Sequence, residues 1–267
     1  MPHSASAERE ERLAASGTPL RVFATADALG EYVAARLLER VEQARVEGRR
    51  FLLGCPTGRS PRPVFAAMAR QLATRPRDVG HLVLVMMDEY LVPRDGALEW
   101  APAEKVWSCH HFARVEIAQR LGVRDESIWF PHPHDPADYD GRIAAAGGID
   151  LFLLASGASD GHVAFNPPGS PRDSLTRIIP LSEETRRDNL STFPAFGTLD
   201  AVPHHGVSVG VATITASREA VMLAMGEGKR LTVERMRRAA GYEADWPATL
   251  IHECAAREIV CDVAAAG

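Results

Sequence analysis

The 267-residue sequence lacks the features that mark several specialised classes of protein. No apolar run approaches the length of a membrane-spanning helix, and residues 1–17 lack the apolar segment of a signal peptide. The four cysteines form no C-x-x-C pair and no zinc spacing, which indicates a reducing compartment. The net charge of -5 argues against nucleic acid as the main partner, although it permits a small anionic ligand. We therefore expect a soluble cytoplasmic protein that binds neither membranes nor nucleic acid.

The remaining composition is that of one globular domain. Hydrophobic residues make up 46% of the chain and charged residues 24%, which provides enough apolar material for a sizeable core. Residues 1–19 are mostly polar and charged, so we expect a mobile N-terminal tail. With no linker or repeat beyond this tail, residues 20–267 are expected to form a single α/β domain.

Short apolar segments alternate with amphipathic segments along the chain. The expected strands are residues 20–25, 51–55, 82–87, 151–155, 176–181, 207–211, 220–225 and 259–263. The expected helices are residues 27–45, 64–72, 108–121, 139–146, 182–189 and 229–239. Residues 94–103 are expected to form a loop, and residues 190–205, which are rich in helix breakers, a mobile lid. This alternation predicts a mostly parallel α/β sheet in a single domain.

The stretch Ile149–Ser170 holds the first candidate for a functional site. Residues 151–155 have the composition of a strand buried on both faces, and small residues that permit a sharp turn follow it. Asp160, Gly161 and His162 come next, at the carboxyl end of a central strand, where open α/β sheets bind ligands. A carboxylate beside a histidine holds the imidazole in one tautomer as a general base. A helix-capping aspartate beside a structural histidine explains these residues equally well.

A second candidate site follows the expected strand at residues 51–55. This strand is joined to the next helix by Pro56-Thr57-Gly58-Arg59-Ser60. A strand, a turn of small residues and a helix direct free backbone N–H groups and the helix dipole toward an anion. An ordinary strand-to-helix connection is the alternative, and the turn is no Walker loop because no G-K-[ST] follows.

Two adjacent acidic residues, Asp88 and Glu89, directly follow the expected strand at residues 82–87. Burying a carboxylate at such a strand end is costly without a partner. Either these side chains reach solvent or the protein uses them.

Two other segments are expected to be exposed surface. His132, His134 and Asp135 could offer ligands to a metal, but the prolines around them and the lack of flanking ligands favour a surface loop. Residues 229–239 form an amphipathic basic helix, which is more often a solvated face than a binding patch. We therefore expect no metal site.

Several motifs occur in a family-like order between about Phe51 and Asp262. They are Leu53–Gly58, Met87–Tyr90, Asp160–Asn166, Thr176–Ile178, Val209–Thr213, Gly226 with Lys229, and Val260–Asp262. The ordered set resembles the glucosamine-6-phosphate deaminase (isomerase) and 6-phosphogluconolactonase superfamily, and within it the deaminase branch. The resemblance implies a Rossmann-like α/β fold with helices on both faces of the sheet, a site at the carboxyl edge of the sheet, and no cofactor.

The resemblance also implies roles for individual residues. His162 would open a sugar ring, Asp88 would move a proton between C2 and C1, and Asp160 would orient His162. The residues expected to bind the substrate or its phosphate are Pro56, Thr57, Gly58, Arg59, Ser60, Glu89, Gly161, Asn166 and His204, of which Arg59 and His204 differ in type from the family's residues. For Glu89, a structural role is equally supported.

At three positions a charged residue of the deaminase pattern is missing. Pro167 stands where a Glu completes an Asp–His–Glu relay. Aligned without gaps, His204 and Ser191 stand where a Lys and an Arg bind the substrate phosphate. Arg59 follows the Thr-Gly of the phosphate turn, where the family usually has a small residue, and we expect its guanidinium to bind the phosphate instead. The alternative is that Arg59 points to water, as arginines in surface turns commonly do. Arg62 is expected to point to water.

The sequence thus predicts an enzyme that isomerises a phosphorylated amino sugar and releases ammonia. One alternative is a 6-phosphogluconolactonase-like hydrolase in which His162 activates water, since Pro168–Pro171 resembles a lactonase motif. The other alternative is a protein that binds a sugar phosphate without turnover. The partner in each case is a small sugar phosphate, and assembly into a homo-oligomer is left open.

Overall fold

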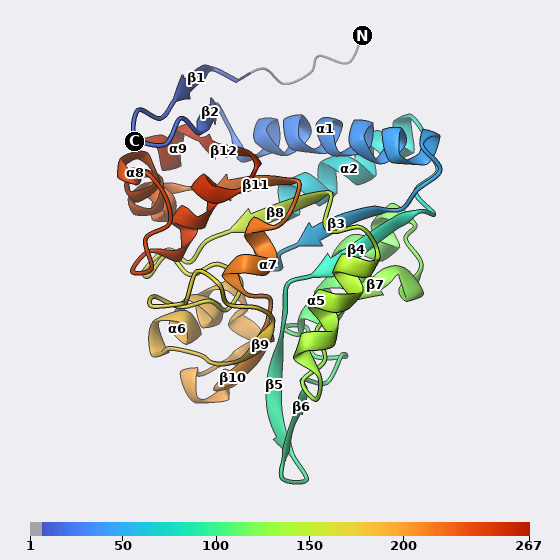
Figure 1. The fold of residues 1–267 in the computed structure, drawn as a ribbon, viewed down its shortest axis with the longest axis vertical. Coiled ribbons are helices and arrows are strands. Elements are labelled where there is room, and N and C mark those ends of the chain that lie inside the picture. The colour runs from blue at the N-terminus through green and yellow to red at the C-terminus, as the bar shows by residue number, and fades with distance from the viewer. Residues whose placement is uncertain (1–6) are drawn as a thin grey trace.

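The apolar segments assemble into one large sheet and one small sheet. The computed structural model describes residues 7–267, so residues 1–6 of the expected tail lie outside the described residues. The large sheet has eight strands in the order β1-β2-β12-β11-β8-β3-β4-β7 (Figure 1). Its strands are β1 Arg9–Arg12, β2 Pro19–Phe23, β3 Phe51–Cys55, β4 Leu82–Met86, β7 Ile128–Trp129, β8 Leu151–Ala155, β11 Glu219–Ala224 and β12 Ala256–Asp262. All neighbours pair in parallel except β1 with β2, which confirms the predicted mostly parallel sheet.

Helices cover both faces of the large sheet because its central strands are apolar at almost every position. Leu53 of β3 packs on the face covered by α1 (Ala26–Val46) and α2 (Arg62–Thr74). The adjacent Leu52 packs on the opposite face. The helices of that face are α5 Pro136–Ala145, α7 Val211–Thr215, α8 Arg230–Arg238 and α9 Val263–Ala266. The expected helix at residues 108–121 is present as α3 Cys109–Phe112, a π-helical stretch Ala113–Ala118, and α4 Gln119–Leu121. None of the helices within residues 7–267 combines the length and the apolar character needed to cross a membrane.

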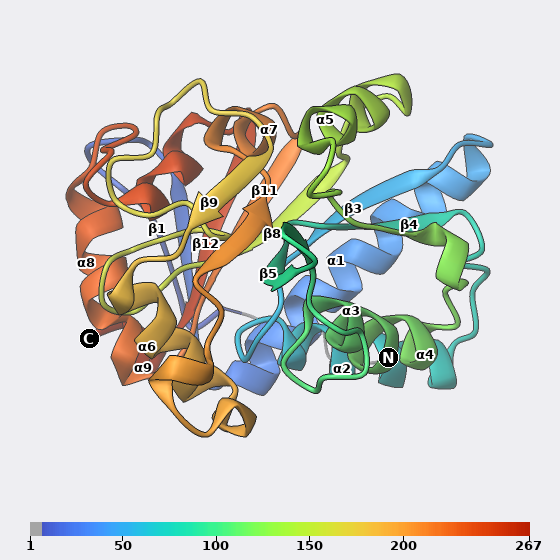
Figure 2. The same cartoon turned by 90° about the horizontal axis from the view of Figure 1, so that it is seen from below.

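The small sheet lies against the carboxyl edge of the large one and is antiparallel throughout (Figures 1 and 2). Its strands, in spatial order, are β6 Ala97–Trp100, β5 Asp88–Arg94, β10 His205–Ser208 and β9 Arg177–Pro180. Only Met87 separates β4 from β5, so the chain passes directly from one sheet into the other. Asp88 is therefore fixed at the junction of the two sheets.

Several local predictions were wrong. The expected tail contains β1, which pairs with β2, and Leu13 behind it is buried. The expected loop at residues 94–103 contains β6, because that segment completes a hairpin with β5. The expected strand at 207–211 ends early: β10 stops at Ser208, and α7 begins at Val211.

The segment expected to be a lid is more ordered than its sequence suggests. The helix α6 (Glu183–Thr192) extends beyond the expected end, and short 3₁₀ turns follow at Pro194–Phe196 and Leu199–Ala201. Phe196 and Val202 are buried against the rest of the chain. The segment thus forms a packed wall beside the edge of the large sheet.

Candidate active site

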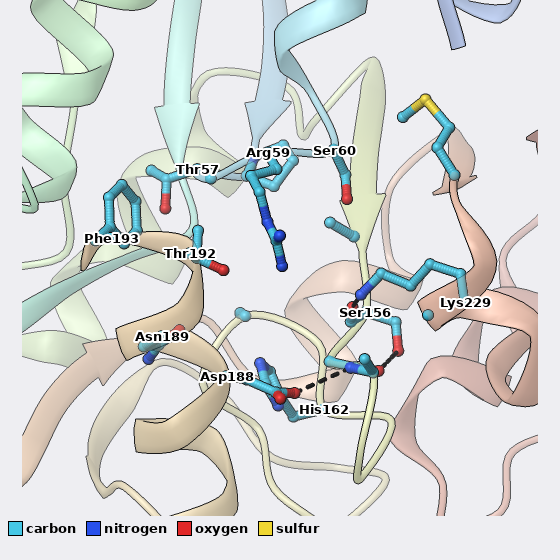
Figure 3. A pocket seen from close by; sticks show the side chains of 18 of the residues that line it. Thr57, Arg59, Ser60, Ser156, His162, Asp188, Asn189, Thr192, Phe193 and Lys229 are labelled. Atoms are coloured by element: carbon cyan, nitrogen blue, oxygen red, sulfur yellow. Dashed lines mark hydrogen bonds between the residues drawn. The ribbon is translucent and has the colours of Figure 1, made fainter. Parts of the chain in front are cut away.

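Loops that follow four neighbouring parallel strands enclose a cavity of about 400 Å³ (Figure 3). The strands are β3, β4, β8 and β11, and the cavity lies at their carboxyl ends. The side opposite these loops is closed by α6. Open α/β sheets bind ligands at this edge, so the cavity is the candidate active site.

His162 lines the cavity and is held by Asp160. The Asp160 carboxylate accepts a hydrogen bond from the His162 Nδ1 atom at 2.7 Å and another from the His162 backbone N–H at 3.1 Å. The other Asp160 oxygen accepts a hydrogen bond from the Thr185 hydroxyl of α6 at 3.1 Å. Burial raises the pKa of Asp160, but the hydrogen bonds and charge of His162 outweigh it, and the pKa falls below its usual value. Asp160 is thus an ionised, firmly held partner for the imidazole.

Two glycines permit this arrangement. A Cβ atom on Gly157 would lie 2.2 Å from the His162 Nδ1 atom and 2.6 Å from the Asp160 carboxylate. Gly161 has a φ of +69°, and a Cβ atom there would meet the ring of Trp246 at 2.5 Å. The sharp turn after β8 therefore needs glycine at both positions to bring Asp160 and His162 together.

Asp88 lines the same cavity as His162 and is almost completely buried, with 5% of its surface exposed. The Cys109 thiol donates a hydrogen bond to its carboxylate at 3.3 Å. Burial raises the pKa of Asp88 to about 7, assisted by the charge of Glu89 and opposed by Cys109 and His162. A carboxyl group with a pKa near neutrality is suited to take up and return a proton.

Glu89 does not face the cavity. Its fully buried carboxylate accepts hydrogen bonds from the backbone N–H groups of Tyr90, Cys109 and His110 and from the Ser108 hydroxyl. The His110 Nδ1 atom lies 2.6 Å from the same carboxylate. Of the two roles considered for Glu89, these contacts support the structural one: Glu89 anchors the start of α3 to β5.

The turn after β3 forms another wall of the cavity. All five of its predicted residues, Pro56, Thr57, Gly58, Arg59 and Ser60, line the cavity. Gly58 has a φ of +91°, which favours glycine. The Arg59 side chain extends into the cavity toward His162 (Figure 3). Arg62 points away from it, with its guanidinium over the Phe112 ring.

Lys229 is a cavity residue that the sequence analysis assigned to a solvated helix. It precedes α8, lines the cavity, and donates a hydrogen bond from Nζ to the Ser156 carbonyl. Burial lowers the pKa of Lys229; the negative charge of Asp188 opposes this effect, and the positive charge of Arg59 adds to it. The sequence signal that could have placed Lys229 in the cavity is its occurrence with Gly226 in the set of family-like motifs.

The family model for glucosamine-6-phosphate isomerases/6-phosphogluconolactonase matches residues 24–260. The chain belongs to this family. A glucosamine-6-phosphate deaminase of Streptomyces avermitilis is 38% identical over 211 residues, covering 75% of this chain and 73% of the relative. A second deaminase, from Shouchella clausii, is 29% identical over 244 residues, covering 89% and 92%. These findings confirm the resemblance drawn from the ordered motifs.

Two solved structures share the fold. A monomeric glucosamine-6-phosphate deaminase has a TM-score of 0.81 at 23% identity, covering 92% of this chain and 98% of that one. The 6-phosphogluconolactonase of Thermotoga maritima has a TM-score of 0.66 at 18% identity, covering 91% and 98%. Both branches of the family therefore have the fold described above.

Three further residues that the family pattern proposes for substrate binding lie outside the cavity. His204 is exposed and does not line the cavity. The Asn166 side-chain amide is buried and donates to the carbonyls of Val163 and Val209, which holds the turn after His162. Gly161 lies beneath Trp246. In the structure, Asn166 and Gly161 shape the loop after β8, and His204 faces solvent.

One group of side chains in the cavity could hold a metal. Asp160, His162 and Asp188 each offer a ligand atom, and these atoms lie within 4.8 Å of one another. Within residues 7–267 no other group of three such side chains is as close. His134, from the segment considered on sequence grounds, instead lies 2.8 Å from the Glu99 carboxylate on the surface. Asp188 was not expected from the sequence.

Proposed function

We propose that this chain converts glucosamine 6-phosphate into the corresponding ketose phosphate and ammonia. The observation that carries the proposal is that Asp88 and His162 line one cavity whose walls also present Arg59 and Lys229. An acid–base pair for the sugar and two cations for a phosphate are thus within reach of one small ligand. Relatives named glucosamine-6-phosphate deaminase at up to 38% identity support this choice of substrate.

In the first step the cyclic sugar opens. His162, oriented by Asp160, passes a proton to the ring oxygen while the C1 hydroxyl loses one, and the C1 aldehyde forms. The hydrogen bond from Nδ1 to Asp160 leaves the other ring nitrogen for the substrate.

In the second step Asp88 takes a proton from C2 and returns it to C1. The resulting imine at C2 adds one water molecule, and ammonia leaves, so that the sum is one amino sugar and one water giving one ketose and one ammonia. The raised pKa of Asp88, about 7, permits both halves of this transfer near neutral pH.

The phosphate would bind between the turn after β3 and Lys229. The guanidinium of Arg59 can hold two phosphate oxygens, and Lys229 adds a second charge. Arg59 would thus provide the charge that the family places at the position of Ser191, which is exposed on α6 and absent from the cavity lining.

The test is ammonia release from glucosamine 6-phosphate by wild type, His162→Gln and the matched control His204→Gln. We expect activity in wild type, a loss of about 10²–10⁴-fold in kcat for His162→Gln, and no change for the exposed His204→Gln. Ammonia release that is unchanged in His162→Gln would contradict the proposal.

Lactone hydrolysis is the second candidate, and Pro167 is the observation that favours it, since this activity does without the family Glu. Hydrolysis needs His162 to activate water but needs no proton transfer at carbon. Asp88→Asn therefore separates the two: it should abolish ammonia release and spare acid release from 6-phosphogluconolactone. Saturable binding of both sugars with neither product would instead indicate a binding protein.

A further inference from the structure

Asp188 lies on the inner side of α6, where it lines the cavity beside His162 (Figure 3). One of its carboxylate oxygens, a ring nitrogen of His162 and an oxygen of Asp160 lie within 4.8 Å of one another. The imidazole is therefore flanked by two carboxylates: Asp160 from its own loop, and Asp188 from a helix 26 residues later in the sequence.

The Asp188 carboxylate is fixed relative to His162. Its Oδ2 atom accepts hydrogen bonds from the backbone N–H of Ala158 at 3.0 Å, the backbone N–H of Ser159 at 3.4 Å, and the Ser159 hydroxyl at 3.0 Å. These donors belong to the loop that carries Asp160 and His162. The carboxylate therefore keeps its place beside the imidazole through direct contacts with that loop.

A carboxylate at this place has a chemical use. The imidazole carries a positive charge while a proton passes through it, and a carboxylate held beside the ring can stabilise that charge and help to keep the ring oriented. The position that supplies a second carboxylate in the deaminase pattern is occupied by Pro167, which has no acidic group and does not line the cavity.

We propose that Asp188 is a positioning residue for His162, a second carboxylate supplied by α6 in place of the one that Pro167 lacks. This inference rests on the proposed function, because ring opening is the step in which His162 moves a proton. The competing explanation is that Asp188 only holds α6 to the loop after β8 through its hydrogen bonds, a purely structural role that we call the latch.

Asp188→Asn distinguishes charge from latch, because asparagine keeps an oxygen that can accept the same three hydrogen bonds. We expect ammonia release by Asp188→Asn to fall on the order of tenfold in kcat, with little change in KM. Asp188→Glu should retain more activity than Asp188→Asn. The matched control is Glu184→Gln, which removes one negative charge from an exposed position of the same helix and should leave kcat unchanged.

A double-mutant cycle with His162→Gln then tests whether Asp188 acts through the imidazole. If it does, Asp188→Asn should have no further effect once His162 is replaced. The same loss in both backgrounds, or an equal loss in Ser159→Ala, would assign Asp188 to the latch and overturn the inference. An Asp188→Asn variant as active as Glu184→Gln would also overturn it. A wild type that releases no ammonia would instead refute the proposed function, and this role with it.

Discussion

Replacing Asp88 with asparagine should weaken catalysis and strengthen the fold at the same time. The carboxyl is 5% exposed, and burial raises its pKa from 3.8 to about 7. Because the unfolded chain loses this proton near pH 4 and the folded protein near pH 7, the unfolding free energy falls as the pH rises through that window. Asparagine carries no charge and escapes this penalty.

The magnitude follows from the shift. A rise in the pKa of Asp88 from 3.8 to about 7 corresponds to roughly 4 kcal/mol when fully developed at pH 8, of which about 1–2 kcal/mol has developed at pH 5. The advantage of Asp88→Asn over wild type in unfolding free energy should therefore grow by roughly 2–3 kcal/mol between pH 5 and pH 8. Comparing the two pH values cancels any pH-independent difference in packing between the side chains.

The assay is urea denaturation of wild type, Asp88→Asn and the control Asp173→Asn at both pH values. Asp173 is exposed, so its substitution should show no comparable change between the two pH values. In parallel, kcat of Asp88→Asn should fall about 10²–10⁴-fold. A stability difference that stays constant between pH 5 and pH 8 would refute the reasoning that Asp88 is a buried base with a raised pKa.

Three other substitutions test separate parts of the site. Arg59→Ala should weaken binding of a phosphosugar more than of its unphosphorylated parent, while Arg62→Ala, outside the cavity, should affect neither; equal weakening of both ligands would remove Arg59 as the anchor. Gly157→Ala should lower kcat at least about tenfold, because its Cβ atom would meet the His162 ring, and unchanged kinetics would contradict that contact. Glu89→Gln should lower the unfolding free energy by about 2–3 kcal/mol in urea denaturation, since the amide cannot accept every hydrogen bond made to the carboxylate.

The parts of the site that the sequence predicts are those built by a short continuous segment. The strand β8 and the Asp160–His162 pair lie within twelve residues of one another, so an apolar run followed by glycines was enough to place them. The turn after β3 was predicted for the same reason. Asp88 was harder, because burial and solvent exposure were both compatible with its position, and only the junction with β5 decides between them.

Residues brought to the cavity by helices were missed because local patterns describe a helix without its neighbours. Lys229 begins a segment whose basic residues mostly do face solvent, and nothing in its own turn distinguishes it. Asp188 was missed for the same reason, because it lies among other charged residues of α6. The strand β6 was missed because it is only four residues long and half-buried throughout, so it depends on pairing with β5, which the sequence of residues 97–100 does not encode.

Two of the three charges that this sequence lacks relative to the family pattern, those at Pro167 and Ser191, have replacements elsewhere in the sequence, and in the proposed mechanism these replacements meet at one cavity. Pro167 and Ser191 each lack a charge that the deaminase pattern has, a carboxylate and a guanidinium. Asp188 and Arg59 supply one of each, so the sum of these charges is unchanged. Their location differs: the positive charge moves from α6 to the turn after β3, and α6 carries the negative charge beside His162. A phosphosugar should then bind with its phosphate toward Thr57–Ser60 and its reacting carbons toward His162, the orientation in which both replacements act in the same direction.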